Sequence, residues 1–178
     1  MNLTDDEFER DMEQNIIVRS YSTISRATPT VLEWHTVTRA TEKYLPYLHS
    51  MLNPAERELF SQDCIKGTRA LWCAKRALET AKELYSSGLH NGNGDAFRHA
   101  YWNALMKDSI GGDWAKKWGD AHETAPGPEL EKQMDLFNNE LGRTLSPSSD
   151  AVRDAIRSGK GRRLVGNALV PTNNAGEA

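Results

Sequence analysis

The residue types best suited to chemistry lie in one stretch of the chain, NGNGDAFRHAYWNALM, at positions 91–106. Its glycine-rich turn leads to Asp95 at the start of a predicted helix, and His99 follows one turn later with Arg98 beside it. Residues four positions apart are neighbours on a helix surface, so the carboxylate and the imidazole should lie side by side. An aspartate and a histidine presented together can bind a metal ion or act on a substrate.

Two further polar clusters follow, DAHE at 120–123 and DLFNN at 135–139. The second repeats the layout of the first stretch, because an aspartate is followed by polar residues three and four positions later. Asparagine is unfavourable in the middle of a helix, so Asn138 and Asn139 are expected to bind a ligand or make buried hydrogen bonds. Two helices with matching polar stripes, packed face to face, would line one polar groove.

Each cluster taken alone also has a structural explanation. Asp95 could cap a helix start, where the aligned peptide dipoles favour negative charge, and His122 and Glu123 could stabilise a helix end. The three clusters together favour a functional site over three separate structural roles.

The clusters supply oxygen and imidazole ligands and no thiolate, which suits a divalent cation such as Zn, Mn, Mg or Ca. The expected metal ligands are Asp95, His99, His122, Asp135 and Asn139. The expected catalytic residues are Arg98, His99, His122 and Glu123. Whichever of His122 and Glu123 is not a ligand is the candidate general base. A metal-free alternative uses Asp95 and His99 as an acid–base pair.

Substrate binding is assigned to a second set of side chains. A guanidinium group can bind the non-bridging oxygens of a phosphate, and an aromatic side chain could form an apolar wall for a lipid-like substrate. The expected substrate-binding residues are Arg98, Trp102, Asn138 and Arg143.

The elements that must position these residues are all predicted helices, with no strand alternation in the sequence. A capping-box-like start at Thr4 begins a short N-terminal helix, and Asn53 precedes a proline at the first helical position. Later helices are expected at 30–51, 54–62, 65–85, 95–107, 113–124, 129–145 and 149–158. The sequence therefore predicts an all-α fold, a compact single-domain bundle of about seven helices. Residues 1–28 form an N-terminal helix and connector, 29–158 the helical catalytic domain, and 159–178 a flexible C-terminal tail.

Composition limits the function classes. The chain has 178 residues, of which 38% are hydrophobic and 26% charged, with a net charge of −3. Such values are typical of one soluble globular domain, and they provide no basic surface of the kind that general nucleic-acid binding requires. The two cysteines, Cys64 and Cys73, do not have zinc-finger spacing. They are interpreted as reduced core residues, with a disulfide as the alternative in an oxidising compartment.

Three ordered motifs carry a resemblance to a known group of proteins. They are NGNGDAFRHAYWNALM at 91–106, AHE at 121–123 and MDLFNNELGR at 134–143. With the helix pair before them, they make roughly residues 52–145 similar to a bacterial domain of unassigned function at the C-termini of Rhs-type, wall-associated and other secreted polymorphic toxins. The resemblance implies a secreted or injected antibacterial effector, with a secretion-system carrier and a cognate immunity protein as partners. It marks eight motif positions, Asp95, Arg98, His99, His122, Glu123, Asp135, Asn138 and Asn139.

The start of the sequence adds an expectation about location. The first 14 residues are acidic and lack an apolar run, so no signal peptide is expected. The protein should be cytoplasmic before export, and secreted or delivered into a target cell without a signal peptide.

The leading functional hypothesis is a metal-dependent hydrolase that cleaves a phosphoester or related bond in a small, lipid-linked or cell-envelope substrate. A nuclease toxin is the nearest enzymatic alternative, although the low net charge makes nucleic acid the less favoured substrate. A non-catalytic, all-α binding or immunity-like module is the third hypothesis, because a fully satisfied buried polar network can specify a core without doing chemistry.

Overall fold

The computed structural model describes residues 52–178, and from Asn53 onward they form one compact unit. The helix expected from Thr4, the connector after it and the helix expected at 30–51 lie outside the described residues. So do the boundary expected between residues 28 and 29 and the first part of the expected catalytic domain.

The described part of the chain is mostly helical, as the sequence predicts. Its six helices, each within a few residues of its expected bounds, are α4 (Pro54–Gln62), α5 (Cys64–Leu84), α6 (Asn93–Ile110), α7 (Gly112–His122), α8 (Glu129–Thr144) and α9 (Ser149–Arg157). They are followed by two antiparallel strands, β1 (Arg162–Val165) and β2 (Ala168–Pro171). Residues 52–178 therefore do not match the expected count of about seven helices, and they contain a small sheet that was not expected. No helix among them is both long and apolar enough to cross a membrane.

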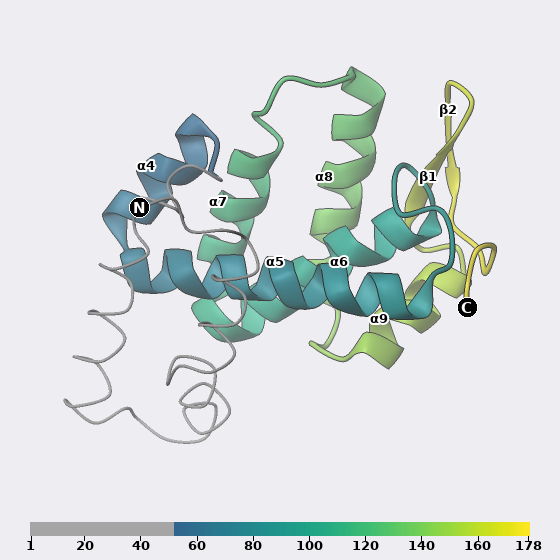
Figure 1. Ribbon diagram of the computed structural model, residues 1–178, viewed down its shortest axis with the longest axis horizontal. Coiled ribbons are helices and arrows are strands. Elements are labelled where there is room, and N and C mark those ends of the chain that lie inside the picture. Colours follow the sequence, from purple (N-terminus) through teal and green to yellow (C-terminus); the bar gives the residue numbers. More distant parts are fainter. Residues whose placement is uncertain (1–51) are drawn as a thin grey trace, which may run out of the picture. The chain divides into compact units, whose positions relative to one another are not determined.

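Helix α6 is the central element of the unit and packs against both α5 and α8 (Figure 1). Most of its residues are buried, including Asp95, His99 and Asn103. Because a buried polar group is costly unless it is hydrogen-bonded, each of these three side chains needs a hydrogen-bond partner. Trp102, expected to contact a substrate, instead lies in the core and donates a 3.0 Å hydrogen bond to the carbonyl oxygen of Ala70 on α5.

Helices α6 and α8 approach each other closely at Gly142. A Cβ atom on this residue would overlap the carbonyl oxygen of Ala100 on α6. The missing side chain thus lets the polar stripe of α8 reach the polar stripe of α6.

We expect Gly142→Ala to lower the free energy of unfolding by about 1–3 kcal/mol, because the added methyl group forces two backbones apart. Urea unfolding measures the change. Gly112→Ala on α7 is the control, since a Cβ atom there meets nothing within 4 Å. Equal stability of the two variants would show that the close approach is not required.

The C-terminal segment, expected as a flexible tail at residues 159–178, contains a hairpin. Strands β1 and β2 pair through a two-residue turn in which Gly166 has a positive φ of 57°, and a glycine there is a typical hairpin signal. The backbone N–H of Leu164 donates to the carbonyl oxygen of Asn91 at 2.8 Å. Asn93 exchanges side-chain and backbone hydrogen bonds with Asn173 at 2.7 and 3.0 Å. The tail therefore braces the turn that leads into α6.

The cysteines agree in part with the first of the two interpretations, because Cys73 is a buried core residue whereas Cys64 is only half-buried. Both are free, and burial raises the pKa of Cys73 to about 12. Cys64 and Cys73 lie on the same helix, α5, where their separation corresponds to about 13 Å of helix rise. That distance is too long for a disulfide.

Candidate functional site

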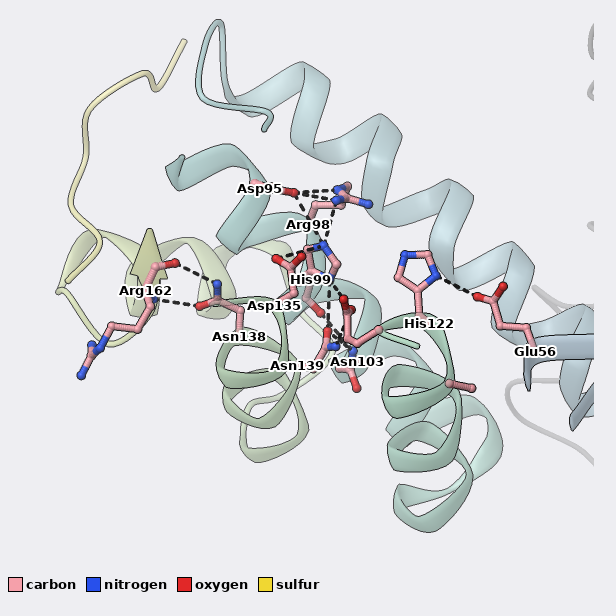
Figure 2. Close-up of polar contacts among 12 residues, drawn as sticks. Glu56, Asp95, Arg98, His99, Asn103, His122, Asp135, Asn138, Asn139 and Arg162 are labelled. Atoms are coloured by element: carbon pink, nitrogen blue, oxygen red, sulfur yellow. Dashed lines mark hydrogen bonds and ion pairs between the residues drawn. The ribbon is translucent and has the colours of Figure 1, made fainter. Parts of the chain in front are cut away.

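The polar clusters of the sequence meet on one side of α6. Helix α6 contributes Asp95, Arg98 and His99, and helix α8 contributes Asp135 and Asn139 (Figure 2). His99 Nε2 lies 3.7 Å from Asp95 Oδ1 and 3.4 Å from Asp135 Oδ1. One ligand atom from each of these three residues lies within 4.8 Å of the other two. The group is of a kind that could hold a metal ion.

Asp95 is held in place by the glycine-rich turn before it. It lies in the first turn of α6, while the N-cap is Gly92, so Asp95 does not have the N-cap role considered from the sequence. Its Oδ2 accepts a 2.7 Å hydrogen bond from the backbone N–H of Asn91, a residue with a φ of 60°. Asparagine is one of the few residues that tolerates this left-handed conformation. One carboxylate oxygen therefore fixes the turn, and the other is left to face His99.

Arg98 forms hydrogen bonds with both Asp95 and His99. Its Nη2 donates to Asp95 Oδ1 at 2.6 Å and to His99 Nε2 at 2.8 Å, and its Nε donates to Asp95 Oδ1 at 3.1 Å. The Arg98 side chain is 31% exposed, whereas that of Asp95 is 3% exposed. The guanidinium therefore covers the buried carboxylate from the solvent side.

A chain of amide side chains fixes the ring of His99. Asn139 Nδ2 donates to Glu123 Oε1 at 3.2 Å, so Asn139 Oδ1 faces His99 Nδ1, also at 3.2 Å. Asn103 Nδ2 donates to the same Oδ1 at 2.7 Å, and Arg143 Nη1 donates to Asn103 Oδ1 at 2.8 Å. Because an amide oxygen can only accept, the proton of the imidazole is on Nδ1 and the lone pair is on Nε2.

Burial is also the main cause of the protonation state of His99. It lowers the pKa of His99 well below the usual value, and the charges of Arg98 and His122 lower it further. The ring is therefore neutral at physiological pH. A neutral imidazole whose other nitrogen is held by a hydrogen bond is the form that binds metal ions in proteins.

Asp135 is the least satisfied group of the site. Its Oδ1 is buried and has no hydrogen-bond partner among the described residues. Burial raises the pKa of Asp135 to about 8, and the nearby carboxylates of Asp95 and Glu123 contribute to the rise. Burial likewise raises the pKa of Glu123. Three carboxyl groups thus lie near a single guanidinium group, and an added cation would reduce the repulsion between their charges.

His122 is at the edge of the site and has a partner that the sequence reasoning missed. Its Nδ1 lies 2.8 Å from Oε1 of Glu56, which stands on the side of His122 away from His99 (Figure 2). Glu56 belongs to a capping box with Asn53 at the start of α4, and the N-x-x-E spacing is the signal that could have identified it. Burial alone would lower the pKa of His122, but the hydrogen bond and the charge of Glu56 raise it.

The structure separates the expected site residues into those that converge and those that do not. Of the expected metal ligands, Asp95, His99 and Asp135 form the group described above. Asn139 instead orients His99, and His122 is bonded to Glu56. Asn138 leaves the site altogether and exchanges 2.8 and 2.9 Å hydrogen bonds with the backbone of Arg162 in β1.

A cleft of about 680 Å³ lies beside this network. Its lining residues come from α7, from the residue that caps its C-terminus and from α8. They are Lys116, Asp120, Glu123, Leu136, Glu140, Arg143 and Thr144. Glu123 belongs both to the cleft and to the surroundings of His99, with its Oε1 3.7 Å from Nδ1. Arg143 lines the cleft and bonds to Asn103, so the cleft is in contact with the buried amide chain.

Comparison with known proteins assigns the chain to a family. No curated protein and no solved structure matches it. Residues 57–158 match the family model described as a domain of unknown function, DUF6973, and this region includes every site residue that the sequence predicts. Because the match spans more than half of the sequence, the chain belongs to the DUF6973 family.

Proposed function

We propose that this protein is a metal-dependent hydrolase in which Asp95, His99 and Asp135 bind a divalent cation. The observation that carries the proposal is the buried Oδ1 of Asp135, which lacks a hydrogen bond and lies 3.4 Å from the lone-pair nitrogen of His99. A buried carboxylate oxygen without a partner is unfavourable when the group is ionised. A cation bound by both groups and by Asp95 would neutralise it.

The ligand chemistry narrows the choice of ion. A set of one imidazole nitrogen and two carboxylates suits Zn²⁺ or Mn²⁺, whereas Mg²⁺ and Ca²⁺ favour sets made of oxygen alone. Three protein ligands leave coordination positions free for water and substrate, as catalytic sites require. When bound, such an ion supplies a water of lowered pKa and polarises the bond to be cleaved.

His122 is the best-placed general base or acid. It is not one of the three proposed ligands, its ring centroid is 6.1 Å from that of His99, and its side chain is 42% exposed. Glu56 holds Nδ1 of the ring and stabilises its protonated form. A histidine oriented by a carboxylate in this way can accept a proton from a nucleophile and return it to a leaving group.

The proposed substrate carries a phosphoester or related bond and is lipid-linked or part of the cell envelope. Arg98 and Arg143 offer guanidinium groups for anionic oxygens, and the net charge of −3 argues against a long polyanion. The resemblance of the three sequence motifs to polymorphic toxins supports an antibacterial role. A nuclease toxin with the same metal chemistry is the second candidate.

Metal binding tests the proposal directly. We expect the full-length protein to bind Zn²⁺ or Mn²⁺ in isothermal titration calorimetry, and His99→Ala to weaken the affinity by at least about 100-fold, because it removes one of three ligands. His90→Ala is the matched control, since the His90 side chain is 79% exposed and His90 is not among the three grouped residues. Circular dichroism must show that both variants are folded.

The competing interpretation is a non-catalytic module whose buried polar network only specifies the core. The chain of bonds from Arg143 through Asn103 and Asn139 favours it. In that case wild-type protein would bind no metal, and His99→Ala would unfold. Absence of metal binding by the wild-type protein would remove the support for a hydrolase, whether or not the variant folds.

Expression in bacteria tests the antibacterial role. We expect growth to stop when wild-type protein is directed to the periplasm with an added leader, and to continue with His99→Ala at an equal protein level. Killing from the cytoplasm alone would favour a nuclease or a soluble substrate. Normal growth in both compartments would contradict the toxin proposal while leaving metal binding to be judged by calorimetry.

A further inference from the structure

Arg98 hydrogen-bonds two of the three side chains that form the proposed metal site. Its Nη2 lies 2.6 Å from Asp95 Oδ1 and 2.8 Å from His99 Nε2 (Figure 2). The Asp95 and His99 side chains supply two of the three ligands in the candidate group. The guanidinium thus binds the same side chains that a divalent ion would bind.

Arg98 and a cation cannot bind the His99 ring at the same time. Nδ1 of His99 carries the ring proton because it faces Asn139 Oδ1, so the ring has a single in-plane lone pair, on Nε2. That lone pair can accept a hydrogen bond from Arg98 or bind a cation at about 2.0–2.1 Å, but it cannot do both.

The protein fixes the ligands and leaves the guanidinium free to move. Asp95 is held through Oδ2 by the backbone N–H of Asn91, and its side chain is 3% exposed. The His99 side chain is 2% exposed and is held by Asn139. The Arg98 side chain is 31% exposed. Of the three groups, only the guanidinium can leave by swinging into solvent.

We propose that Arg98 is a displaceable gate of the metal site: its guanidinium competes with the divalent cation for Asp95 and His99, and it must swing outward when the cation binds. This inference rests on the proposed metal site. Once displaced, the guanidinium remains on the same turn of α6 as both ligands, where it can bind an anionic oxygen of a substrate next to the cation. The substrate class that this arrangement favours is an oxyanion such as a phosphoester.

The gate predicts that removal of Arg98 strengthens metal binding, the opposite of what removal of a ligand does. We expect Arg98→Met to raise the affinity for Zn²⁺ by about 10-fold to 100-fold, because the ion no longer displaces charge-assisted hydrogen bonds. Arg98→Gln, which retains a polar side chain without the charge, should raise it less. Isothermal titration calorimetry on the full-length protein with Zn²⁺ alone measures both.

A second readout separates displacement from simple charge repulsion. In wild-type protein, the Nε–H signal of Arg98 in a nitrogen–proton NMR spectrum, assigned by its loss in Arg98→Met, should shift to a solvent-exposed position when Zn²⁺ is added. Repulsion without displacement would strengthen binding in the variant but leave this signal in place.

The outcomes distinguish the gate from the metal site. If wild-type protein and both Arg98 variants bind no Zn²⁺, the proposed function fails and the gate fails with it. If wild-type protein binds Zn²⁺ and the variants bind no more tightly, or the Arg98 signal does not move, the gate is wrong and the metal site stands. Tighter binding together with a shifted signal supports the gate.

Discussion

Asp135→Asn is expected to make the metal-free protein more stable than the wild type at alkaline pH while it removes metal binding. Burial and two neighbouring carboxylates raise the pKa of Asp135 from 3.8 to about 8. The folded state therefore retains a proton that the unfolded chain has already lost. Between pH 4 and 8 the folded state binds more protons than the unfolded one, so this group makes the free energy of unfolding fall as pH rises.

The size of the effect follows from the same shift. Below about pH 4 the carboxyl group is neutral in both states, and it contributes no difference between aspartate and asparagine. Above pH 8 the whole penalty of a buried, ionised carboxylate is present, on the order of a few kcal/mol. Asparagine at this position never ionises. The stability difference between the variant and the wild type should therefore be near zero only below about pH 4, reach roughly a quarter of its full value at pH 5 and be complete at pH 9.

Urea unfolding in the presence of a chelator at pH 5, 7 and 9 measures this difference. Other groups with shifted pKa values, such as His99 and Glu123, are present in both proteins and largely cancel in the comparison. Added Zn²⁺ should then stabilise the wild type but not the variant. Asp108→Asn, on the exposed side of α6, is the control. A variant that is destabilised by the same amount at all three pH values would show that Asp135 is a structural hydrogen-bond partner.

Between residues 54 and 157, the sequence predicts the helices well because their ends carry local signals. Asn53 and the proline after it mark the start of α4 within one residue, and glycines and prolines mark the breaks around α7. The hairpin of β1 and β2 has no comparable signal besides its turn. Each strand has four residues, and the tail is held by bonds such as that from Asn93 to Asn173, 80 positions away. Interactions of that range are not visible in local patterns.

The sequence likewise predicts the contacts of the site only in part. The matching polar stripes predict that His99 faces the asparagines that follow Asp135, and His99 does contact Asn139. The sequence also suggests that Asn138 joins them, and it does not. Neighbouring residues on a helix point about 100° apart, so only one of the two asparagines can face α6 and the other faces β1. The partnership of His122 with Glu56 spans 66 positions and depends on how α4 packs against α7.

That partnership gives the second large prediction. If His122 is the general base or acid of a hydrolase, His122→Gln should reduce kcat by about 10²- to 10⁴-fold. Metal affinity should change little, because His122 is not among the three grouped ligands. Glutamine is close in size and can still hydrogen-bond to Glu56, so the packing against Trp102, 5.1 Å from the His122 ring by centroids, should be retained. Hydrolysis of a chromogenic phosphodiester in the presence of Zn²⁺ or Mn²⁺ measures the rate, and calorimetry measures the affinity.

Glu56→Gln separates catalysis by His122 from a structural role. The carboxylate raises the pKa of His122, so the substitution should shift the corresponding limb of the pH–rate profile to lower pH. Loss of the capping box at Asn53 also weakens α4 by about 1 kcal/mol. Asn53→Ala is the control because it removes the cap, and the bonds from Asn53 Nδ2 to the carbonyl oxygens of Ala121 and His122, but keeps the Glu56 carboxylate that faces His122 Nδ1. A fall in rate without a shift in the pH profile, or an equal fall in both variants, would assign the pair to holding α4 on α7. A shift in Glu56→Gln alone would make Glu56 the positioning residue of a catalytic histidine.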